Sequence, residues 1–421
     1  MRFLTFILLF QFLFIQAQFL PTLSLEQRAE STLNDVNYSD IEKFGFSSSE
    51  IPSRYSLEKY AIVKNQKDAS SCTGFAVSGA LSILYNKLNN ISVHSQQVVH
   101  SFDPNYIYSS LKDVSDLNCL GCDCGSSIPK ALELVENFGV KKQALTPELT
   151  CDISLNKSIL YKMGYMTKYY RVDQWLNFVD WEKISGTWYY NININGIKEA
   201  ISYGFPVVTG IYTSQKFIDE NNNCLLAKGQ TGPHAVSIIG YDDYRNGGSF
   251  KVLNSYGYDW GDDGYFWIKY NDLKNIFASS GVYMPWNDDG DFSSWKRDVN
   301  TDIFYKGELS SGKFWEGPLL NDYVHGTGIL VAKDYSMIAN YENGILNGWS
   351  LYFGNDDESF WGAINFKNGE EIDKEDWGFA SDDDQNWIAT KMKGINLDNK
   401  KPDDKVIDML ENTSRVPLKS K

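Results

Sequence analysis

The chain has 421 residues, which at about 150 residues per domain predicts two to three domains, and its 43% hydrophobic and 15% aromatic content excludes wholesale disorder. Thirty-nine Lys and Arg residues against 54 Asp and Glu residues give a net charge of −15. No general cationic field is therefore available to hold phosphate backbones or an anionic bilayer, and we expect no nucleic acid among the partners.

The N-terminus has the layout of a secretory signal peptide. Arg2 precedes an apolar run from Phe3 to Ile15, and the small residue Ala17 follows it. This run is shorter than the roughly 20 apolar residues that a membrane-spanning helix needs. We therefore predict a signal peptide over residues 1–17, export to the outside or the periplasm, and an oxidising compartment in which disulfides can form.

The central part of the chain predicts an α+β domain. Residues 18–50 are polar and without period, so a short leader or pro-segment is expected there. Apolar periodicity and capping residues then predict helices over 72–88, 128–138 and 197–203. Short strand-like runs separated by Gly, Asp and Asn turns follow. Helices first and strands second predict one domain over residues 51–285 with two segregated halves and a cleft between them.

The C-terminal part predicts a separate β domain. After a linker over residues 286–301, three segments pair an aromatic strand with a glycine turn, at Gly312, Gly344 and Gly369. These segments resemble MORN repeats, which are stacked β-hairpins, although glycine spacings of 32 and 25 residues do not keep one register. A plain all-β appendage is the alternative. We assign residues 302–375 to this domain and residues 376–421 to a charged tail.

One cysteine stands in a position suited to nucleophilic catalysis. Cys72 follows a polar approach and opens an apolar helix, where the positive end of the helix dipole lowers the pKa of a thiol. A small core cysteine without chemistry is the alternative interpretation.

A thiolate nucleophile needs an imidazole partner, and the chain offers four histidines. His234 opens a predicted strand after a Gly-Pro turn, whereas His94, His100 and His325 lie in settings that favour structural or solvated roles. A second strand ends at Asn254, twenty residues after His234. If these strands are adjacent and antiparallel, the Asn254 amide oxygen lies beside the ring and selects its tautomer.

These residues carry a resemblance to papain-like cysteine peptidases over about residues 51–283. Gln66 lies six residues before Cys72, His234 stands in the context H-A-V-x-x-x-G-Y, and Asn254 opens N-S-Y-G, followed by W-G-x-x-G-Y. The segments GSSIPKALELVENFGV and IKEAISYGFPVVTGIY resemble bacterial members of the family. The resemblance implies a papain-like two-lobed fold, with a helical left lobe and an antiparallel β-barrel-like right lobe.

The resemblance also implies an activity, the hydrolysis of protein or peptide substrates through a thioester acyl-enzyme. It makes Cys72 the nucleophile, His234 the general base and acid, and Asn254 the residue that orients the ring. Gln66 becomes the oxyanion-hole amide together with the Cys72 N–H. Gly125 becomes the position that meets the substrate backbone. The reaction requires no cofactor and no metal.

Departures from the family pattern keep two other hypotheses open. The aromatic residue usually next to the nucleophile is Thr73, and the tryptophan usual after the Asn-Ser pair is Tyr256. Both changes motivate a catalytically silent binding module as an alternative. A scaffold whose repeat region meets a protein or surface partner is the other. We expect a monomer, and the sequence leaves cleavage specificity open.

The remaining cysteines are Cys119, Cys122, Cys124, Cys151 and Cys224. Disulfides among the first four are favoured over free thiols and over a zinc site, because the compartment is oxidising and no histidine joins the cluster at a finger-like spacing.

Overall fold

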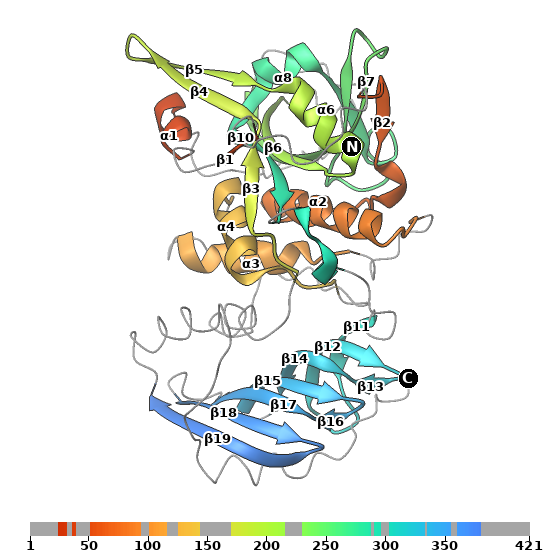
Figure 1. Ribbon diagram of the computed structural model, residues 1–421, viewed down its shortest axis with the longest axis vertical. Helices are drawn as coiled ribbons and strands as arrows, with labels where there is room; N and C mark the ends of the chain where they lie inside the picture. Colours follow the sequence, from red (N-terminus) through yellow and green to blue (C-terminus); the bar gives the residue numbers. More distant parts are fainter. Residues whose placement is uncertain are drawn as a thin grey trace, which may run out of the picture.

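The computed structural model describes residues 24–31, 36–38, 51–93, 101–115, 125–143, 170–214, 230–287, 290–295, 303–332, 335–354 and 360–379. The chain forms a helical lobe, a β lobe and a C-terminal sheet, and in Figure 1 the helical lobe lies between the two sheets. Within the described residues, no helix is both long enough and apolar enough to span a bilayer.

The helical lobe consists of α2 (Cys72–Leu88), α3 (Pro104–Ser115) and α4 (Ile128–Phe138). Every residue of α2 from Cys72 to Asn86 is buried, as expected for a helix that is apolar nearly all round. The predicted helices over 72–88 and 128–138 are confirmed, whereas α3 was not predicted. Both α3 and α4 pack against α2, which makes α2 the centre of the lobe.

The β lobe is one sheet in the order β1-β3-β10-β6-β7-β8-β9, with β2 added beside β7. Its strands are β1 (Val36–Asn37), β2 (Arg54–Ser56), β3 (Gln174–Asn177), β6 (Val207–Ser214), β7 (Gln230–Asp242), β8 (Ser249–Leu253), β9 (Tyr265–Lys269) and β10 (Phe277–Trp286). Two helices contact this sheet, α6 (Ile194–Tyr203) and α8 (Tyr270–Ile276), whereas the short η2 (Glu58–Tyr60) contacts α2, and η5 (Ser293–Trp295) brings Trp295 against Phe102.

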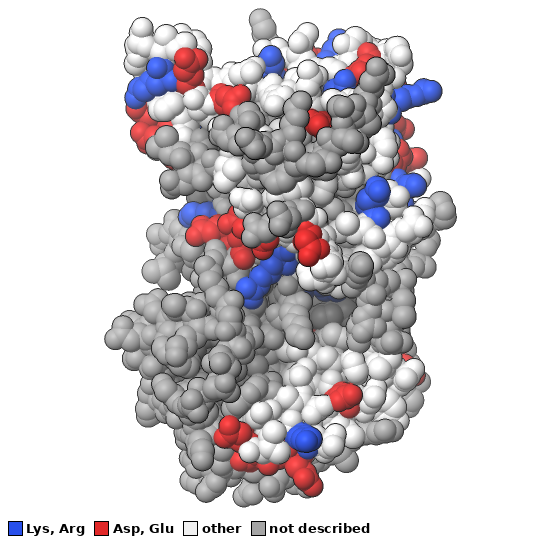
Figure 2. All heavy atoms as spheres, in the orientation of Figure 1, with Lys and Arg blue, Asp and Glu red and all other residues white. Residues whose placement is uncertain are grey.

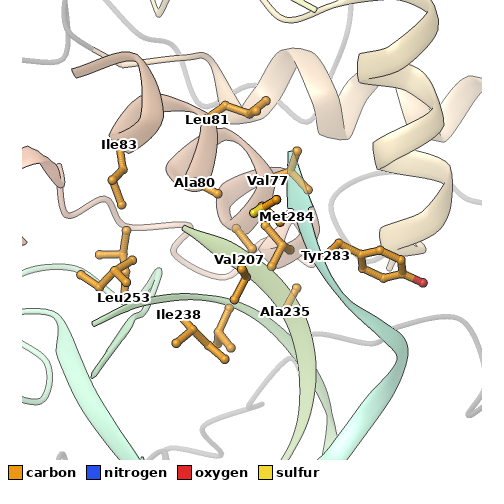
Figure 3. Packing of buried hydrophobic residues seen from close by; sticks show 14 of the residues in the cluster. Val77, Ala80, Leu81, Ile83, Val207, Ala235, Ile238, Leu253, Tyr283 and Met284 are labelled. Atoms are coloured by element: carbon orange, nitrogen blue, oxygen red, sulfur yellow. The ribbon is translucent and has the colours of Figure 1, made fainter. Parts of the chain in front are cut away.

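The α+β fold is confirmed, but the predicted barrel-like closure of the right lobe is wrong. The sheet is open, because among the described residues β1 and β9 are the two ends of its path, and β1 runs parallel to β3. A barrel fills its interior with its own side chains, whereas this sheet buries a face against α2. Figure 3 shows Val77 and Ala80 of α2 meeting Val207 of β6 and Ala235 of β7.

An N-terminal segment packs on the β lobe. Helix α1 (Leu25–Glu30) begins with a capping box between Ser24 and Gln27 and contacts β10. The buried Arg28 donates from Nη1 to the Phe277 carbonyl at 3.1 Å. α1 also contacts β5 (Thr187–Ile192), which forms a separate hairpin with β4 (Val179–Ile184).

The C-terminal sheet is an antiparallel succession of hairpins. It contains β11 (Ile303–Glu308), β12 (Phe314–Leu320), β13 (Tyr323–Val324), β14 (Gly326–Val331), β15 (Tyr335–Glu342), β16 (Ile345–Leu346), β17 (Gly348–Gly354), β18 (Phe360–Lys367) and β19 (Glu370–Phe379).

Three of the hairpins share one turn geometry. Each has two consecutive residues with positive φ, the pairs being Asn321-Asp322, Asn343-Gly344 and Asn368-Gly369. This conformation matches the twist of antiparallel strands and suits Asn, Asp and Gly. The turns begin at positions 321, 343 and 368 and are thus 22 and 25 residues apart. The turn equivalent to Gly344 and Gly369 is therefore Asn321-Asp322 rather than the one at Gly312.

One face of this sheet packs against the helical lobe. Glu316, Ile329 and Ile338 are paired across β12, β14 and β15, and the two isoleucines belong to the same buried cluster as α2 and the β lobe. Their neighbours along the strands, Trp315, Leu330 and Met337, belong to a second cluster, because alternate residues face opposite sides of a strand. The sheet therefore has an apolar cluster of its own and a face that contacts the rest of the chain.

A buried ion pair lies in this contact. The Lys141 ammonium, just after α4, bonds to the Glu316 carboxylate and lies 3.7 Å from Asp103 Oδ2. The side chains of Lys141 and Glu316 are only 4% and 2% exposed. A charge removed from water costs free energy unless an opposite charge pairs with it, so each of these two side chains requires the other.

Removal of the Glu316 carboxylate is expected to destabilise the fold. Glu316→Ala leaves Lys141 buried with the more distant Asp103, which predicts a loss of roughly 3 to 5 kcal/mol of unfolding free energy. Urea denaturation followed by circular dichroism measures it. As a matched control, Glu26→Ala breaks the exposed 3.1 Å pair with Lys183 and should cost less than about 1 kcal/mol. An equal loss of unfolding free energy in the two variants would contradict a stabilising role of the buried Lys141–Glu316 pair.

Candidate active site

Cys72 is the first residue of α2 and is buried where α2 meets β7. The main chain of Ala235 on β7 lies within hydrogen-bonding reach of the Cys72 sulfur. One helical turn further along, Ser237 Oγ donates to the Ala76 carbonyl at 2.7 Å. These contacts fix the beginning of α2 against the part of β7 that carries His234.

His234 and Asn254 form a direct hydrogen bond. β7 and β8 are antiparallel, with Ser237 opposite Leu253, and Asn254 follows the end of β8. His234 Nε2 lies 2.8 Å from Asn254 Oδ1, and both side chains are buried. The predicted pairing of adjacent strands is thus present.

The hydrogen bonds around Asn254 define the tautomer of the His234 ring. The Ser255 N–H also donates to Asn254 Oδ1, at 2.9 Å, which identifies this atom as the amide oxygen. Because an amide oxygen only accepts, Nε2 carries the proton in the neutral ring. Nδ1 is then the basic nitrogen, and it is buried without a hydrogen-bond partner among the residues that the structure describes.

Two aromatic residues shelter this pair. The Tyr256 ring stacks on the His234 ring with centroids 4.9 Å apart, and Trp260 meets Tyr256 edge-on at 5.4 Å. Tyr256, which stands where the family usually has a tryptophan, thus covers the imidazole. An aromatic face excludes water from the His234–Asn254 hydrogen bond and thereby strengthens it.

Gln66 is tied to the residue after Asn254. The Ser255 hydroxyl donates to Gln66 Oε1, and Gln66 Nε2 donates one of its protons to the Ala69 carbonyl at 2.7 Å. The main chains are also joined, since Gln66 N–H donates to the Ser255 carbonyl at 2.8 Å. Ser255, which the sequence reasoning did not single out, therefore contacts both Gln66 and Asn254.

Gly125 lies beside the first turn of α2. It precedes Ser126, whose carbonyl accepts a hydrogen bond of 3.0 Å from Thr73 Oγ1. Gly125 is partly exposed, which leaves its backbone accessible next to the helix that begins at Cys72.

Burial disfavours the charged forms of both Cys72 and His234. It raises the pKa of the Cys72 thiol, although hydrogen bonds involving Ala235 and Thr73 lower it. Burial also lowers the pKa of the His234 imidazole to about 4, against the effect of its bond to Asn254. The helix start was predicted to lower the thiol pKa, but the loss of hydration outweighs the dipole because Cys72 is fully enclosed.

The other predicted candidates lie elsewhere. His325 is in the C-terminal sheet, where its Nδ1 accepts from the Asn343 N–H at 3.1 Å. Of the six cysteines only Cys72 lies within the described ranges, and its thiol is free. His94, His100 and the cysteines at 119, 122, 124, 151 and 224 are outside those ranges. No group of three His, Cys, Asp or Glu residues suited to a metal ion occurs in the described part of the chain.

Surface charge is mixed. On the face shown in Figure 2, basic and acidic side chains alternate over the described residues without a continuous basic patch.

The family pattern described as "Papain family cysteine protease" matches residues 49–285, which is more than half of the chain. The chain therefore belongs to the papain family of cysteine proteases, a family of hydrolases.

Curated relatives are distant. An uncharacterized peptidase C1-like protein of Acanthamoeba polyphaga mimivirus is 24% identical over 239 residues, covering 52% of this chain and 68% of that protein. Cysteine proteinase 2 of Zea mays is 25% identical over 208 residues, covering 48% and 51%. The chain thus spans about half the length of the maize protein.

Among solved structures, xylellain, a cysteine protease from Xylella fastidiosa, is 18% identical with a TM-score of 0.45, over 64% of this chain and 95% of that one. The bromelain protease from Ananas comosus is 16% identical with a TM-score of 0.38, over 56% and 98%.

The neutral state of the buried ring can be tested in a variant that forms no thiolate. In Cys72→Ala, His234 is expected to titrate with a pKa of about 4, against 6.5 when solvated. Because the folded pKa is the lower one, the neutral ring stabilises the fold above pH 6.5. This contribution, roughly 3 kcal/mol at most, is lost as the pH falls towards 4. NMR titration of the ring, assigned with His234→Gln, measures the pKa, and a value at or above 6.5 would contradict the enclosed site.

Proposed function

We propose that this protein is an exported cysteine peptidase of the bacterial type that hydrolyses peptide bonds with Cys72, His234, Asn254 and Gln66. The observation that carries the proposal is the buried His234–Asn254 hydrogen bond of 2.8 Å beside the start of α2. This bond keeps the ring proton on Nε2 and leaves Nδ1 as the basic nitrogen. Cys72 lies next to the same stretch of β7.

In the first half of the reaction, the Cys72 thiol proton passes to His234 Nδ1. The thiolate attacks the carbonyl carbon of the peptide bond, and negative charge develops on the carbonyl oxygen. The second proton of Gln66 Nε2 and the Cys72 N–H donate to this oxygen. The tetrahedral intermediate then collapses, the C–N bond breaks, and the proton on Nδ1 goes to the leaving amine. A thioester on Cys72 remains.

In the second half, a water molecule attacks the thioester carbonyl while Nδ1 takes its proton. The C–S bond breaks, the carboxylic product leaves, and the proton returns from the ring to Cys72. Asn254 keeps Nε2 protonated throughout, so that Nδ1 alone exchanges protons. No cofactor or metal takes part.

Burial raises the pKa of the Cys72 thiol and lowers that of the His234 imidazole, and the transfer of one proton between them is how both can become charged. A lone thiolate or a lone imidazolium is disfavoured in this enclosed place, as the directions of the two pKa shifts indicate. When one proton moves from sulfur to Nδ1, both charges arise together and the net charge does not change. Each group alone would stay neutral in this enclosure, whereas the two together form a thiolate–imidazolium ion pair. That ion pair is the nucleophilic form.

The remaining parts of the proposal rest on the sequence and the hairpin turns. Export through the signal peptide over residues 1–17 delivers a monomeric enzyme outside the cell or into the periplasm. The repeated hairpins at 321, 343 and 368 support a MORN-like region available for a protein or surface partner. Gly125, beside the first turn of α2, contributes backbone contacts to the substrate.

A peptide-library digest under reducing conditions tests the activity. The purified wild-type protein is expected to cleave library peptides, and Cys72→Ala to cleave none, since the nucleophile is lost. His234→Ala should be equally inactive, whereas the matched control His325→Ala should retain wild-type rates because its ring lies in the C-terminal sheet. A library left intact by every variant and by the wild type would refute the peptidase.

The contribution of Gln66 has its own measurement. Gln66→Ala removes one oxyanion donor and should lower kcat by about 10² to 10³. Gln143→Ala is the matched control, because Gln143 is also buried and its Oε1 also accepts from a serine hydroxyl, that of Ser101 at 3.0 Å. Comparable losses in both variants would mean that a general structural defect, rather than the oxyanion contact, is responsible.

A further inference from the structure

The start of α3 lies directly against the helix that carries Cys72. Gly74 is buried in the first turn of α2, two residues after Cys72. A Cβ atom at Gly74 would lie 2.5 Å from the Pro104 carbonyl oxygen and 3.2 Å from the Tyr108 amide nitrogen. Only glycine, which has no Cβ, permits so close an approach of the two main chains. The place of the first turn of α2 therefore depends on the place of Pro104.

Asp103 holds the start of α3 in place. Its Oδ1 accepts from the N–H groups of Asn105 at 2.9 Å and of Tyr106 at 3.3 Å, which are the bonds of a helix N-cap. Its own N–H donates to the Lys141 carbonyl at 2.9 Å, and its Oδ2 lies 3.7 Å from the Lys141 ammonium. Asp103 is thus fixed between the first turn of α3 on one side and Lys141 on the other.

Lys141 is held in turn by the C-terminal sheet. Its ammonium bonds to the carboxylate of Glu316 on β12, and both side chains are buried. Without this carboxylate the ammonium would be drawn towards Asp103 Oδ2, because a buried charge requires an opposite charge. Such a movement pulls Asp103 away from the N–H groups that it caps, and Pro104 follows because it is the next residue in the chain.

We propose that Glu316 of the C-terminal sheet is a positioning residue that keeps Cys72 in place through Lys141 and the start of α3. The inference rests on Cys72 being the nucleophile proposed above. Glu316 acts only through these contacts and does not touch the substrate. The family match ends at residue 285, so the carboxylate comes from a part of the chain outside the protease lobes. The C-terminal sheet thus supports the active site in addition to any surface that it offers to a partner.

A paired substitution separates positioning from stability. Glu316→Met should lower kcat for a cleaved library peptide by roughly 10 to 10² with little change in KM, because misplacing a reacting group by about 1 Å can cost 10²-fold. Lys141→Met combined with Glu316→Met removes both buried charges, a replacement that is often neutral for stability. Urea denaturation should then show restored stability, whereas kcat should stay low because Asp103 has lost its ammonium. Recovery of kcat together with stability would overturn the inference.

Amide hydrogen exchange measures the same coupling without peptide hydrolysis. In the double variant, the first turns of α2 and α3 should exchange about tenfold faster than in the wild type, since local opening there becomes easier. Asp243→Asn is the matched control, because it removes the carboxylate of another partly buried pair, Lys198–Asp243 at 2.8 Å, which lies in the β lobe. It should leave kcat and the exchange of α2 unchanged. Unchanged exchange of α2 in the double variant would contradict the role of Glu316.

Two glycines of α2 test the last contact in the series. Gly74→Ala forces a Cβ against the Pro104 carbonyl and should lower kcat at least as much as Glu316→Met. Gly79→Ala makes the same change in the same helix, but its Cβ would lie 3.4 Å from Leu253 Cδ2, an ordinary contact, so kcat should be retained. Equal kcat values in these two variants would overturn the inference. Faster exchange of α2 in the double variant with a peptide library that the wild type leaves intact would keep Glu316 as assigned and refute only the peptidase.

Discussion

The hydrogen bond from His234 Nε2 to Asn254 Oδ1 is the interaction on which the proposed chemistry depends. It exists because β7 and β8 are antiparallel neighbours and Asn254 follows the last residue of β8. The Ser255 N–H shares the same oxygen, and the stacked Tyr256 ring keeps water away. A rigid sheet thus determines which ring nitrogen holds a proton and which one is left to exchange it.

Enclosure of the site has a cost that the surrounding groups offset only in part. Burial alone favours a neutral thiol and a neutral imidazole. The main chain at Ala235 and the donors of Thr73 act in the other direction at the sulfur. In the proposed mechanism Cys72 and His234 share one low-dielectric region, so that a single proton transfer produces two charges that stabilise each other. The proposed mechanism would gain further from this enclosure, which strengthens hydrogen bonds to the developing oxyanion.

The C-terminal sheet is more closely integrated than a linker and a repeat pattern suggest. Ile329 and Ile338 belong to the core of the preceding lobes, and Glu316 neutralises Lys141 just beyond α4. α4 in turn follows the Gly125–Ser126 loop that Thr73 contacts. The protease lobes and the hairpin sheet therefore share one buried interface, while Trp315 and its neighbours give the sheet a cluster of its own.

The sequence by itself determined the features that depend on residues close together in the chain. Apolar periodicity predicted α2 and α4, and the order and spacing of Gln66, Cys72, His234 and Asn254 selected the residues that the fold gathers around α2. Only the tertiary structure decided the open sheet, the Ser255 contacts, the raised pKa of Cys72, the Thr73–Ser126 bond and the Lys141–Glu316 pair. The reason is physical, since helices and turns follow from interactions within a few residues, whereas burial and partner choice depend on segments far apart in the chain.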